Sequence, residues 1–314
     1  MISHSCIVEE GIPQQLRLDR YIAENLKLLT RSQIRARKLL ARVNGKEVKI
    51  SRILRSGDSL ELQWAGTVIP DLIPEDIPLD VIYEDSRAVV VNKAQGMVVH
   101  PGAGNYCGTL ANALLYRGLA KTDGSSGFRS PGPENSLRPG IVHRLDKDTS
   151  GLIIAAWDDG ALEFLARQFR KRKAVKTYAA LVQGTPKEQQ GRIETRIARN
   201  PRNRKLFAVS GEKGKKSLTL YKTVSSWGRY SLLLLRPKTG RTHQLRVHLK
   251  ALGHPILGDP LYGSADPLFP RATLMLHAKR LSVVLPGHQE QETFRTPLPW
   301  RFHKILLSCK QWKP

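Results

Sequence analysis

Three prolines divide the chain into a short and a long part. Pro70, Pro74 and Pro78 all fall within residues 67–80. Because proline lacks a backbone N–H and fixes φ, this stretch cannot form a regular helix, and we expect a semi-rigid linker. The sequence therefore predicts two domains, residues 1–66 and residues 81–314, and its 314 residues leave room for one small and one large core.

The shorter part has the pattern of a compact unit. Apolar residues recur at helical spacing over residues 18–26 and again over residues 34–40, which predicts two short helices. Asn44-Gly45 predicts a tight turn between strands, because both residues tolerate positive φ, and Gly57-Asp58 repeats this device before a further strand. We expect a small α/β unit that ends near residue 62.

The chain is strongly basic, and this charge constrains its partners. It carries 51 Lys and Arg against 27 Asp and Glu, a formal net charge of +24. Such an excess predicts an anionic partner, above all nucleic acid, although a generally basic protein without such a partner is the plain alternative. A membrane is not indicated, because no apolar stretch approaches the ~18 residues of a span. One face of the shorter unit is especially basic, with the following residues: Arg20, Lys27, Arg31, Arg35, Arg37, Lys38, Arg42, Lys46 and Lys49.

The termini and cysteines bear on location. Residues 1–13 lack the cationic start, apolar core and cleavage site of a signal peptide, so we expect a cytoplasmic protein. Cys6, Cys107 and Cys309 are odd in number and far apart, which indicates neither a disulfide framework nor a zinc knuckle. We expect them to be reduced.

The longer part mixes strand and helix patterns. Helices are predicted at 109–119, 158–168 (with Asp158 as its N-cap) and 242–252. Residues 121–139 are rich in Gly, Ser and Pro and predict a surface loop. Strands outnumber helices and do not alternate with them strictly, so we expect an α+β fold with a mixed, mainly antiparallel sheet. The predicted strands are 81–83, 88–91, 152–156, 177–182, 218–224, 230–235 and 274–285.

Familiar catalytic signatures are missing from the sequence. Residues 214–217 lack the spacing of a phosphate-binding P-loop, residues 102–104 lack the third glycine of a dinucleotide fingerprint, and no Gly-x-Ser-x-Gly elbow exists. Several residues could be considered as metal ligands, but none has the spacing of a known metal motif, so we expect no metal site. These residues are His143, Asp146, Asp148, His243 and His248.

Residues 141–154 differ in kind from the rest of the chain. Charged residues lie between two apolar runs that must be buried, and residues 148–151 have the composition of a tight turn. Asp146 would thus be held on a rigid loop at the edge of the core. From the residues alone, an ordinary surface pair of Asp146 with Arg144 is an equally good interpretation.

The segment His143-Arg144-Leu145-Asp146-Lys147-Asp148-Thr149-Ser150-Gly151 resembles the HRLDxxTSG signature of the RluA-type pseudouridine synthases. Residues 91–102, 176–178, 240–249, 253–263 and 276–278 agree with the same family, and residues 17–22, 43–45 and 57–60 resemble the S4 RNA-binding domain. Within the family, the similarity is greatest to the RluD-like branch that modifies large-subunit ribosomal RNA. Ala94, where the family usually has proline, and the long 121–139 segment are local departures.

The resemblance implies isomerisation of specific uridines to pseudouridine in structured RNA. It assigns catalysis to Asp146, with Tyr178 stacking on the flipped base and Arg241 pairing with the aspartate. Arg144 and His143 would bind substrate, and Leu276 would close the pocket. In the S4-like unit, basic residues would contact RNA, among them Arg31, Arg35 and Lys38. No cofactor is expected, because the isomerisation involves no net redox change and no external group.

Two alternatives stay open at this point. Asp146 and Asp148 could form the paired carboxylates of a glycoside hydrolase, although residues two apart in a turn suit that role poorly. The chain could also be a non-catalytic RNA-binding or ribosome-assembly factor. For the enzyme, we expect ribosomal RNA as the partner, a monomeric state and no membrane attachment.

Overall fold

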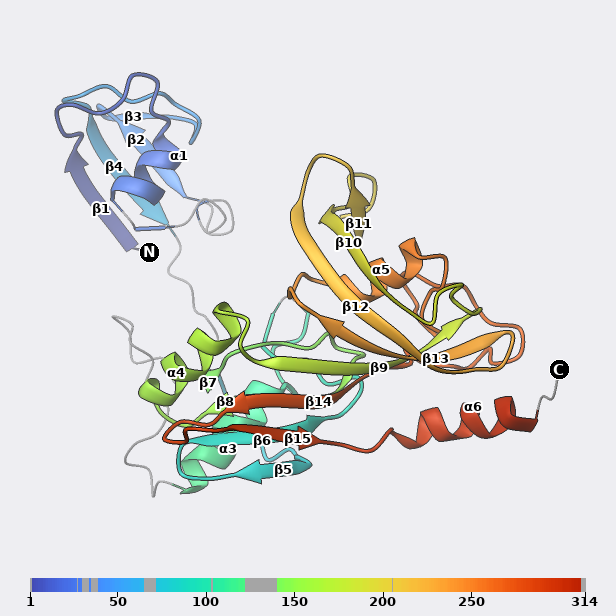
Figure 1. Ribbon diagram of the computed structural model, residues 1–314. Helices are drawn as coiled ribbons and strands as arrows, with labels where there is room; N and C mark the ends of the chain where they lie inside the picture. The colour runs from blue at the N-terminus through green and yellow to red at the C-terminus, as the bar shows by residue number, and fades with distance from the viewer. Residues whose placement is uncertain are drawn as a thin grey trace. The chain divides into compact units, whose positions relative to one another are not determined.

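The computed structural model describes residues 2–26, 28–29, 34, 39–64, 72–102, 104–121, 140–204 and 206–311. The chain divides into two compact units, residues 1–70 and 71–314 (Figure 1). Lys27, most of the second predicted helix with Arg31, Arg35, Arg37 and Lys38, and the predicted 121–139 loop from residue 122 onward lie outside the described residues.

The first unit is built on a four-stranded sheet with strand order β1-β4-β2-β3. Its strands are β1 Ile2–Ile7, β2 Leu40–Val43, β3 Lys46–Glu47 and β4 Ser59–Trp64. The helix predicted from residue 18 begins as α1 Leu18–Arg20 and continues as a π-helical turn, η1 Tyr21–Asn25. Leu18, Ile22 and Leu60 are completely buried in its core. The predicted turn between β2 and β3 is confirmed, with positive φ at both Asn44 (51°) and Gly45 (75°).

The second unit contains an eleven-stranded sheet, ordered β11-β10-β12-β13-β9-β14-β8-β6-β5, with β15 paired to β14 and β7 paired to β8. Among the described strands, β14 and β8 form the parallel pair, and the others pair antiparallel. The predicted mixed, mainly antiparallel α+β fold is thus confirmed. Its strands are β5 Val81–Glu84, β6 Ala88–Lys93, β7 Gly140–Ile141, β8 Ser150–Ala156, β9 Val175–Gln183, β10 Gln190–Arg199, β11 Phe207–Ser210, β12 Lys215–Ser226, β13 Tyr230–Pro237, β14 Leu276–Val284 and β15 Gln291–Arg295.

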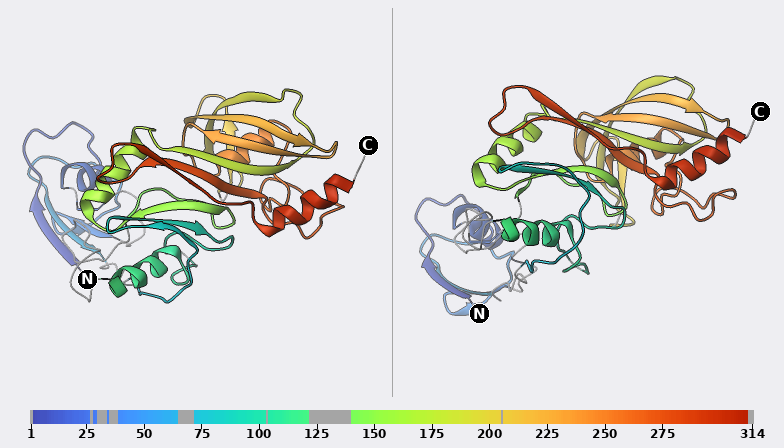
Figure 2. Two further views of the ribbon diagram at one scale, coloured as in Figure 1. Left: turned by 60° about the horizontal axis from the view of Figure 1, so that its bottom comes forward. Right: turned by 90° about the horizontal axis from the view of Figure 1, so that it is seen from below.

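Two helices cover opposite faces of one end of this sheet (Figure 2). Strands alternate their side chains, so β6 and β8 present one apolar set to α3 Leu110–Lys121 and the other to α4 Asp159–Arg170. Asp158 caps α4 as predicted, since its side chain accepts a hydrogen bond of 2.8 Å from the Ala161 backbone N–H. Helix α5 Gln244–Ala251 confirms the third predicted helix, whereas α6 Trp300–Gln311 was not predicted.

The described residues of the predicted linker pack on the second unit. Leu72 and Leu79 contact the apolar cluster under α3. The Asn112 side chain donates a 2.8 Å hydrogen bond to the Ile73 carbonyl, and the Glu75 carboxylate accepts from the Gly108 N–H at 3.0 Å. From residue 72 onward, this stretch therefore belongs to the edge of the larger unit. Within the described residues, no helix is both long and apolar enough to cross a bilayer.

Candidate active site

Asp146 lies in the loop between β7 and β8, and several backbone contacts fix that loop. The Thr149 N–H donates to the Asp146 carbonyl at 3.1 Å and closes the predicted turn. Lys93 is 1% exposed, and its ammonium donates to the carbonyls of Ala94 (2.8 Å), Met97 (2.8 Å) and Lys147 (3.1 Å). Burial lowers the pKa of Lys93 to about 8, but three acceptors satisfy its three donors. The loop is consequently tied to the end of β6.

A glycine lets the strand after the loop approach its neighbour. Gly151 has φ of 114°, and a Cβ added there would lie 2.4 Å from the Ala278 carbonyl oxygen. Only glycine fits this close pairing of β8 with β14. The pairing brings Leu276 of β14 to the cavity that Asp146 also lines.

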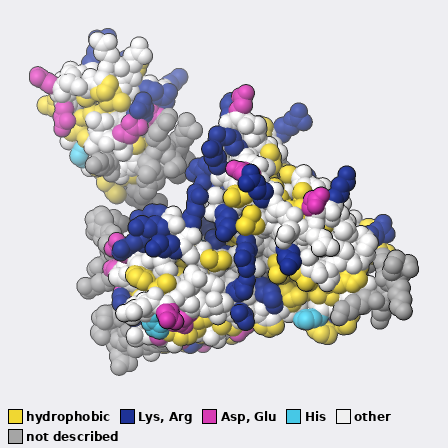
Figure 3. All heavy atoms as spheres, viewed as in Figure 1, with side chains coloured by type: hydrophobic (Ala, Val, Ile, Leu, Met, Phe, Trp, Pro, Cys, Tyr) yellow, Lys and Arg dark blue, Asp and Glu magenta, His cyan; other side chains and the backbone are white. Residues whose placement is uncertain are grey.

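This cavity is a cleft of about 470 Å³. Figure 3 shows Lys and Arg side chains gathered in a band over the middle of this face of the second unit. Among the described residues lining the cleft, one carboxylate, that of Asp146, faces eight cationic side chains. The eight are Arg144, Arg170, Arg172, Lys176, Arg236, Lys238, Arg241 and Arg246. The cleft thus concentrates positive potential and suits a polyanionic substrate.

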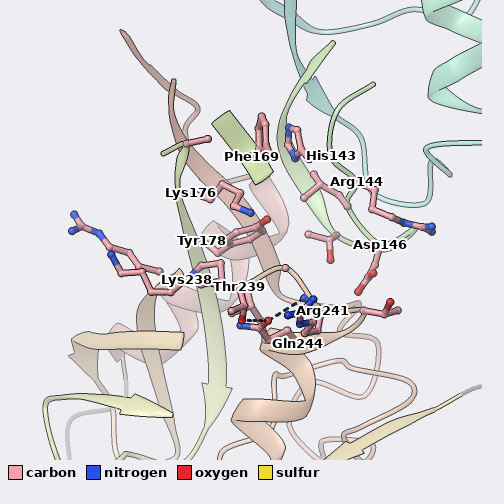
Figure 4. Close-up of a pocket in the computed structure, with 18 of the residues that line it drawn as sticks. His143, Arg144, Asp146, Phe169, Lys176, Tyr178, Lys238, Thr239, Arg241 and Gln244 are labelled. Carbon is pink, nitrogen blue, oxygen red and sulfur yellow. Dashed lines mark hydrogen bonds between the residues drawn. The ribbon is translucent and has the colours of Figure 1, made fainter. Parts of the chain in front are cut away.

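The arginine that pairs with Asp146 is Arg246, which corrects the predicted pairing with Arg241. Arg246 Nη1 lies 3.5 Å from Asp146 Oδ2, and its side chain is 3% exposed. Arg241 precedes α5, where its Nε donates to the Lys216 carbonyl at 3.2 Å. Its backbone N–H donates to Gln244 Oε1 at 3.0 Å, as Figure 4 shows. The buried face of α5 carries Arg246 to the aspartate, whereas Arg241 lies at the rim.

A second carboxylate holds the Arg246 guanidinium in place. Arg246 Nε and Nη2 donate to the two oxygens of Asp259 at 2.8 and 2.6 Å, the bidentate geometry that suits arginine. The guanidinium also lies over the Tyr262 ring, 5.0 Å from its centroid. Burial opposes its charge, yet the hydrogen bonds and charge of Asp259, with Asp146, raise the pKa of Arg246. Arg246 therefore remains a fixed cation beside Asp146.

His243 also faces Asp146. Its Nε2 lies 3.9 Å from Asp146 Oδ2, and its Nδ1 lies 2.8 Å from the Tyr262 hydroxyl. Burial is the main reason that the pKa of His243 is lowered. From the sequence, His243 was a candidate only as a metal ligand, and the structure groups it with the aspartate instead. Across the described residues, no cluster of three or more His, Cys, Asp or Glu could hold a metal ion.

The remaining wall of the cleft is apolar and aromatic. Tyr178 of β9 is 8% exposed, and burial together with the charge of Asp146 raises its pKa. Leu145 and Leu276 belong to the same buried cluster as Tyr178. Tyr178 and Leu276, both predicted from the sequence, thus line one cleft with Asp146. Figure 4 shows Tyr178 and Asp146 in this cleft. This wall offers a dry surface on which a planar base can stack.

His143 and Arg144 lie next to each other but have different surroundings. The His143 ring stacks on Phe169 at 4.5 Å, and its Nε2 accepts a 3.1 Å hydrogen bond from the Ile154 N–H. Burial lowers its pKa to about 3, so the ring is neutral at physiological pH. Arg144 is exposed at the cleft. Its side chain can move toward a bound ligand, whereas that of His143 is fixed.

Sequence reasoning missed Arg246 and the basic residues that complete the cleft. Arg246 lies in the same motif as Arg241, three residues before Leu249, so the helical pattern of 242–252 places it on the same side as this apolar residue. Arg170 and Arg172 come from the end of α4, and Arg236 and Lys238 from the end of β13. Their convergence depends on strand order, which no local pattern reveals.

The α+β fold and its basic cleft suit a polyanionic substrate, and comparison with known proteins identifies the family. Residues 87–251 match the family model described as RNA pseudouridylate synthase. The chain therefore belongs to the RNA pseudouridylate synthase family, as the resemblance implied. The match spans the aspartate loop and the helix that carries Arg246.

Individual relatives agree with the family. The chain is 43% identical to ribosomal large subunit pseudouridine synthase D of Borreliella burgdorferi, over 93% of this chain and 89% of that protein. It is 43% identical to an uncharacterized RNA pseudouridine synthase of Chlorobaculum parvum, over 93% of each chain. Among solved structures, human RNA pseudouridylate synthase domain containing 1 aligns with a TM-score of 0.55 and 29% identity, covering 75% of this chain and 96% of that one.

Proposed function

We infer that this protein converts specific uridines to pseudouridine in large-subunit ribosomal RNA. The observation that carries this inference is the single carboxylate of Asp146, held by Arg246 at 3.5 Å in a cleft with eight cationic side chains. A glycoside hydrolase would need a second carboxylate across the bond, and no other described residue of the cleft lining supplies one. The relative from Borreliella burgdorferi, named for the large ribosomal subunit, supports the choice of RNA.

The reaction breaks the N1–C1′ bond of uridine, turns the base and joins C5 to C1′, while the proton on C5 moves to solvent and N1 gains one. Asp146 acts as nucleophile or base toward the ribose or the uracil. Arg246 orients this carboxylate and places a positive charge beside it. Because atoms and electrons balance within the nucleoside, the reaction needs no external group.

Different residues of the cleft contact different parts of the RNA. Tyr178 and Leu276 form the surface against which the flipped uracil stacks. Arg144, exposed beside the aspartate, fills the gap that the base leaves or holds a phosphate. His143 supports the loop and contributes to substrate binding through its position in the wall. The cationic rim, Arg241 included, contacts backbone phosphates.

The test is a product assay on ribosomal RNA. RNA from a strain lacking the gene is treated with wild-type protein or with the Asp146→Asn variant and is then mapped by chemistry selective for pseudouridine. The proposal expects new pseudouridines with the wild type and none with the variant. A protein that binds the RNA and leaves every uridine unchanged would instead be the non-catalytic assembly factor.

We further propose that residues 1–66 form an S4-like RNA-binding domain that supplies affinity rather than chemistry. Its separate core and its four-stranded sheet support this role. So do its basic residues, of which Arg31, Arg35 and Lys38 lie outside the described part of the chain. The enzyme would act on ribosomal RNA as a monomer in the cytoplasm.

Deleting residues 1–66 tests this second role. The truncated protein should bind RNA more weakly and with a flatter salt dependence, because fewer phosphates are neutralised. It should still modify a short RNA at high concentration. A truncated protein that folds but makes no product at any RNA concentration would contradict the proposal.

A further inference from the structure

We propose that His243 is a positioning residue whose Nε2–H, together with Arg246, holds Oδ2 of Asp146 so that Oδ1 meets the uridine. This inference rests on the proposed function of Asp146. Both neighbours address the same oxygen: Arg246 Nη1 lies 3.5 Å and His243 Nε2 3.9 Å from Oδ2. The side chain of Asp146 is 24% exposed, so its other oxygen is free to face the cleft.

A hydrogen-bond chain determines which nitrogen of His243 carries the proton. The Tyr262 hydroxyl accepts from the Phe207 backbone N–H at 2.9 Å and lies 2.8 Å from His243 Nδ1. A hydroxyl has one proton to donate, and no other acceptor for it occurs in the described part of the chain. Tyr262 therefore donates to Nδ1, which leaves the imidazole proton on Nε2, the nitrogen that faces Asp146.

The backbone at His243 supports a specific role for its side chain. His243 is the N-cap of α5 and has φ of 55°, in the left-handed region that side-chain-bearing residues adopt uncommonly. Its ring meets the Tyr262 ring edge-on at 5.5 Å and the Phe207 ring at 5.7 Å. The backbone of His243 is thus in an unfavourable conformation, and two aromatic rings contact its imidazole. Such a combination is expected where the orientation of a side chain matters for function.

The charges around His243 favour its neutral form. Asp146 and Arg144 face it from the aspartate loop, Arg246 from α5, and Asp259 from the loop before Tyr262. The two carboxylates and two guanidinium groups oppose each other, and burial lowers the pKa of the imidazole. A neutral Nε2–H can orient a carboxylate without forming a full ion pair with it, so Asp146 keeps its reactivity.

The 3.9 Å separation is longer than a hydrogen bond. Catalytic hydrogen bonds are often long without substrate and tighten in the bound complex, and we expect this contact to shorten when the uridine binds. Arg246 faces Oδ2 through Nη1 alone, because Asp259 already holds its Nε and Nη2. His243 therefore provides a second donor that limits rotation of the Asp146 carboxylate.

Two substitutions separate this role from simple packing. Gln places its amide nitrogen where His243 has Nε2, and Asn places its amide where His243 has Nδ1. His243→Gln keeps the donor toward Asp146, and His243→Asn keeps only the contact with Tyr262. We expect turnover at saturating RNA to be at least tenfold higher for His243→Gln than for His243→Asn, ~1.4 kcal/mol in barrier, with similar RNA affinity.

The control is built into this pair, because Asn tolerates positive φ better than Gln and is the less strained variant. A purely structural role would therefore favour His243→Asn. Turnover of His243→Asn that equals or exceeds that of His243→Gln would overturn the proposal. So would near-normal turnover in both variants or an equal loss in both.

The tautomer can be measured without activity. Long-range ¹⁵N correlation spectra of the imidazoles, with the His243 signal assigned by its loss in His243→Asn, should show a protonated Nε2 and a bare Nδ1 at neutral pH. Tyr262→Phe should weaken this preference. A protonated Nδ1 in the wild type would overturn the proposal even if pseudouridine is made. If no pseudouridine is made while Nε2 is protonated, the proposed function fails and the assigned tautomer stands.

Discussion

Asp146 and Asp259 face the same guanidinium, yet their surroundings are opposite. The Asp259 side chain is 0% exposed and accepts two hydrogen bonds from Arg246, at 2.8 and 2.6 Å. It also accepts from the backbone N–H groups of Leu261 and Tyr262 at 2.9 and 3.0 Å. Asp146 is 24% exposed, and its nearest cation is 3.5 Å away.

The difference shows how one arginine serves two purposes. Asp259 is saturated with donors, so it is inert and acts to fix Arg246. Arg246 orients the Asp146 carboxylate and stabilises its charge. Its oxygens are not saturated with hydrogen-bond donors, so their lone pairs remain available for chemistry. In the proposed mechanism, Asp146 can react because the fold leaves its carboxylate without a full set of hydrogen-bond donors, whereas the buried Asp259 uses its hydrogen bonds to hold Arg246.

The largest effect should come from Asp146→Asn. No hydrogen bond to the Asp146 carboxylate occurs among the described residues, so the variant should fold with a melting temperature near that of the wild type. Removing the proposed catalytic carboxylate should lower single-turnover activity at saturating RNA by at least ~10⁴-fold, ~5.5 kcal/mol in barrier. Residual turnover within about tenfold of wild type would refute the assigned role.

Asp259→Asn should show the reverse behaviour, a loss of stability. It removes the charge that compensates a buried guanidinium, which typically costs ~3 to 5 kcal/mol. For a unit of this size, the melting temperature should fall by on the order of 10 °C. Thermal unfolding followed by circular dichroism measures this, with Asp146→Asn as the matched control. Equal melting temperatures for the two variants would remove the distinction between the carboxylates.

The sequence predicted several local features of the fold, including the turn at the site. The composition of 148–151 indicated the turn that holds Asp146, Asp158 indicated a helix cap, and Asn44-Gly45 indicated a turn; all three are present. Each depends on a preference of a few adjacent residues. Such preferences can be predicted because they depend on the residues within one turn and not on distant contacts.

Contacts between residues far apart in the sequence could not be predicted in the same way. Arg241 and Arg246 lie in one motif, and which of them meets an aspartate 100 residues away depends on the direction in which α5 leaves β13. Strand β10 was missed because charged residues separate Ile193 from Ile197, a spacing that also suits a helix. Helix α6 carries Phe302, Ile305 and Cys309 on its buried face, a helical spacing that could have been read.

A third prediction concerns acid and the layer behind Arg246. His248 lies on the same helix, with Thr195 and Ser217 hydroxyls 3.0 Å from its Nε2, and burial lowers its pKa to about 4. The unfolded chain has an ordinary histidine pKa of ~6.5, so below that pH the unfolded state binds one more proton. The free energy of unfolding should therefore fall as pH falls from ~6.5 to ~4, by up to ~1.4 kcal/mol per pH unit for this residue.

Urea unfolding at several pH values measures this slope. His143 and His277, whose pKa values burial lowers to about 3, should add similar contributions over the same range. His248→Gln lacks the titrating group and should show a shallower slope than the wild type, whatever its stability at neutral pH. An unchanged slope in His248→Gln would mean that His248 is not neutral in the folded protein.

The smallest effect should come from Arg241→Lys, and it decides which arginine serves Asp146. Arg241 is half-buried at the rim, and its side chain donates to the Lys216 carbonyl, an acceptor that a lysine ammonium can also reach. Arg241→Lys should therefore keep saturated turnover within about threefold and mainly raise the RNA concentration needed, since a single phosphate contact shifts affinity and its salt dependence.

Arg246→Lys is the matched control for that comparison. A lysine is a point charge and cannot hold both oxygens of Asp259 while it also faces Asp146, so we expect saturated turnover to fall by at least ~100-fold, ~2.7 kcal/mol in barrier at ~1.36 kcal/mol per tenfold. If Arg241→Lys instead abolished saturated turnover and Arg246→Lys did not, the ion pair at 3.5 Å would be incidental. Catalysis would then depend on a movement that brings Arg241 from the rim to the aspartate, and the contrast between Asp146 and Asp259 would no longer explain which carboxylate reacts.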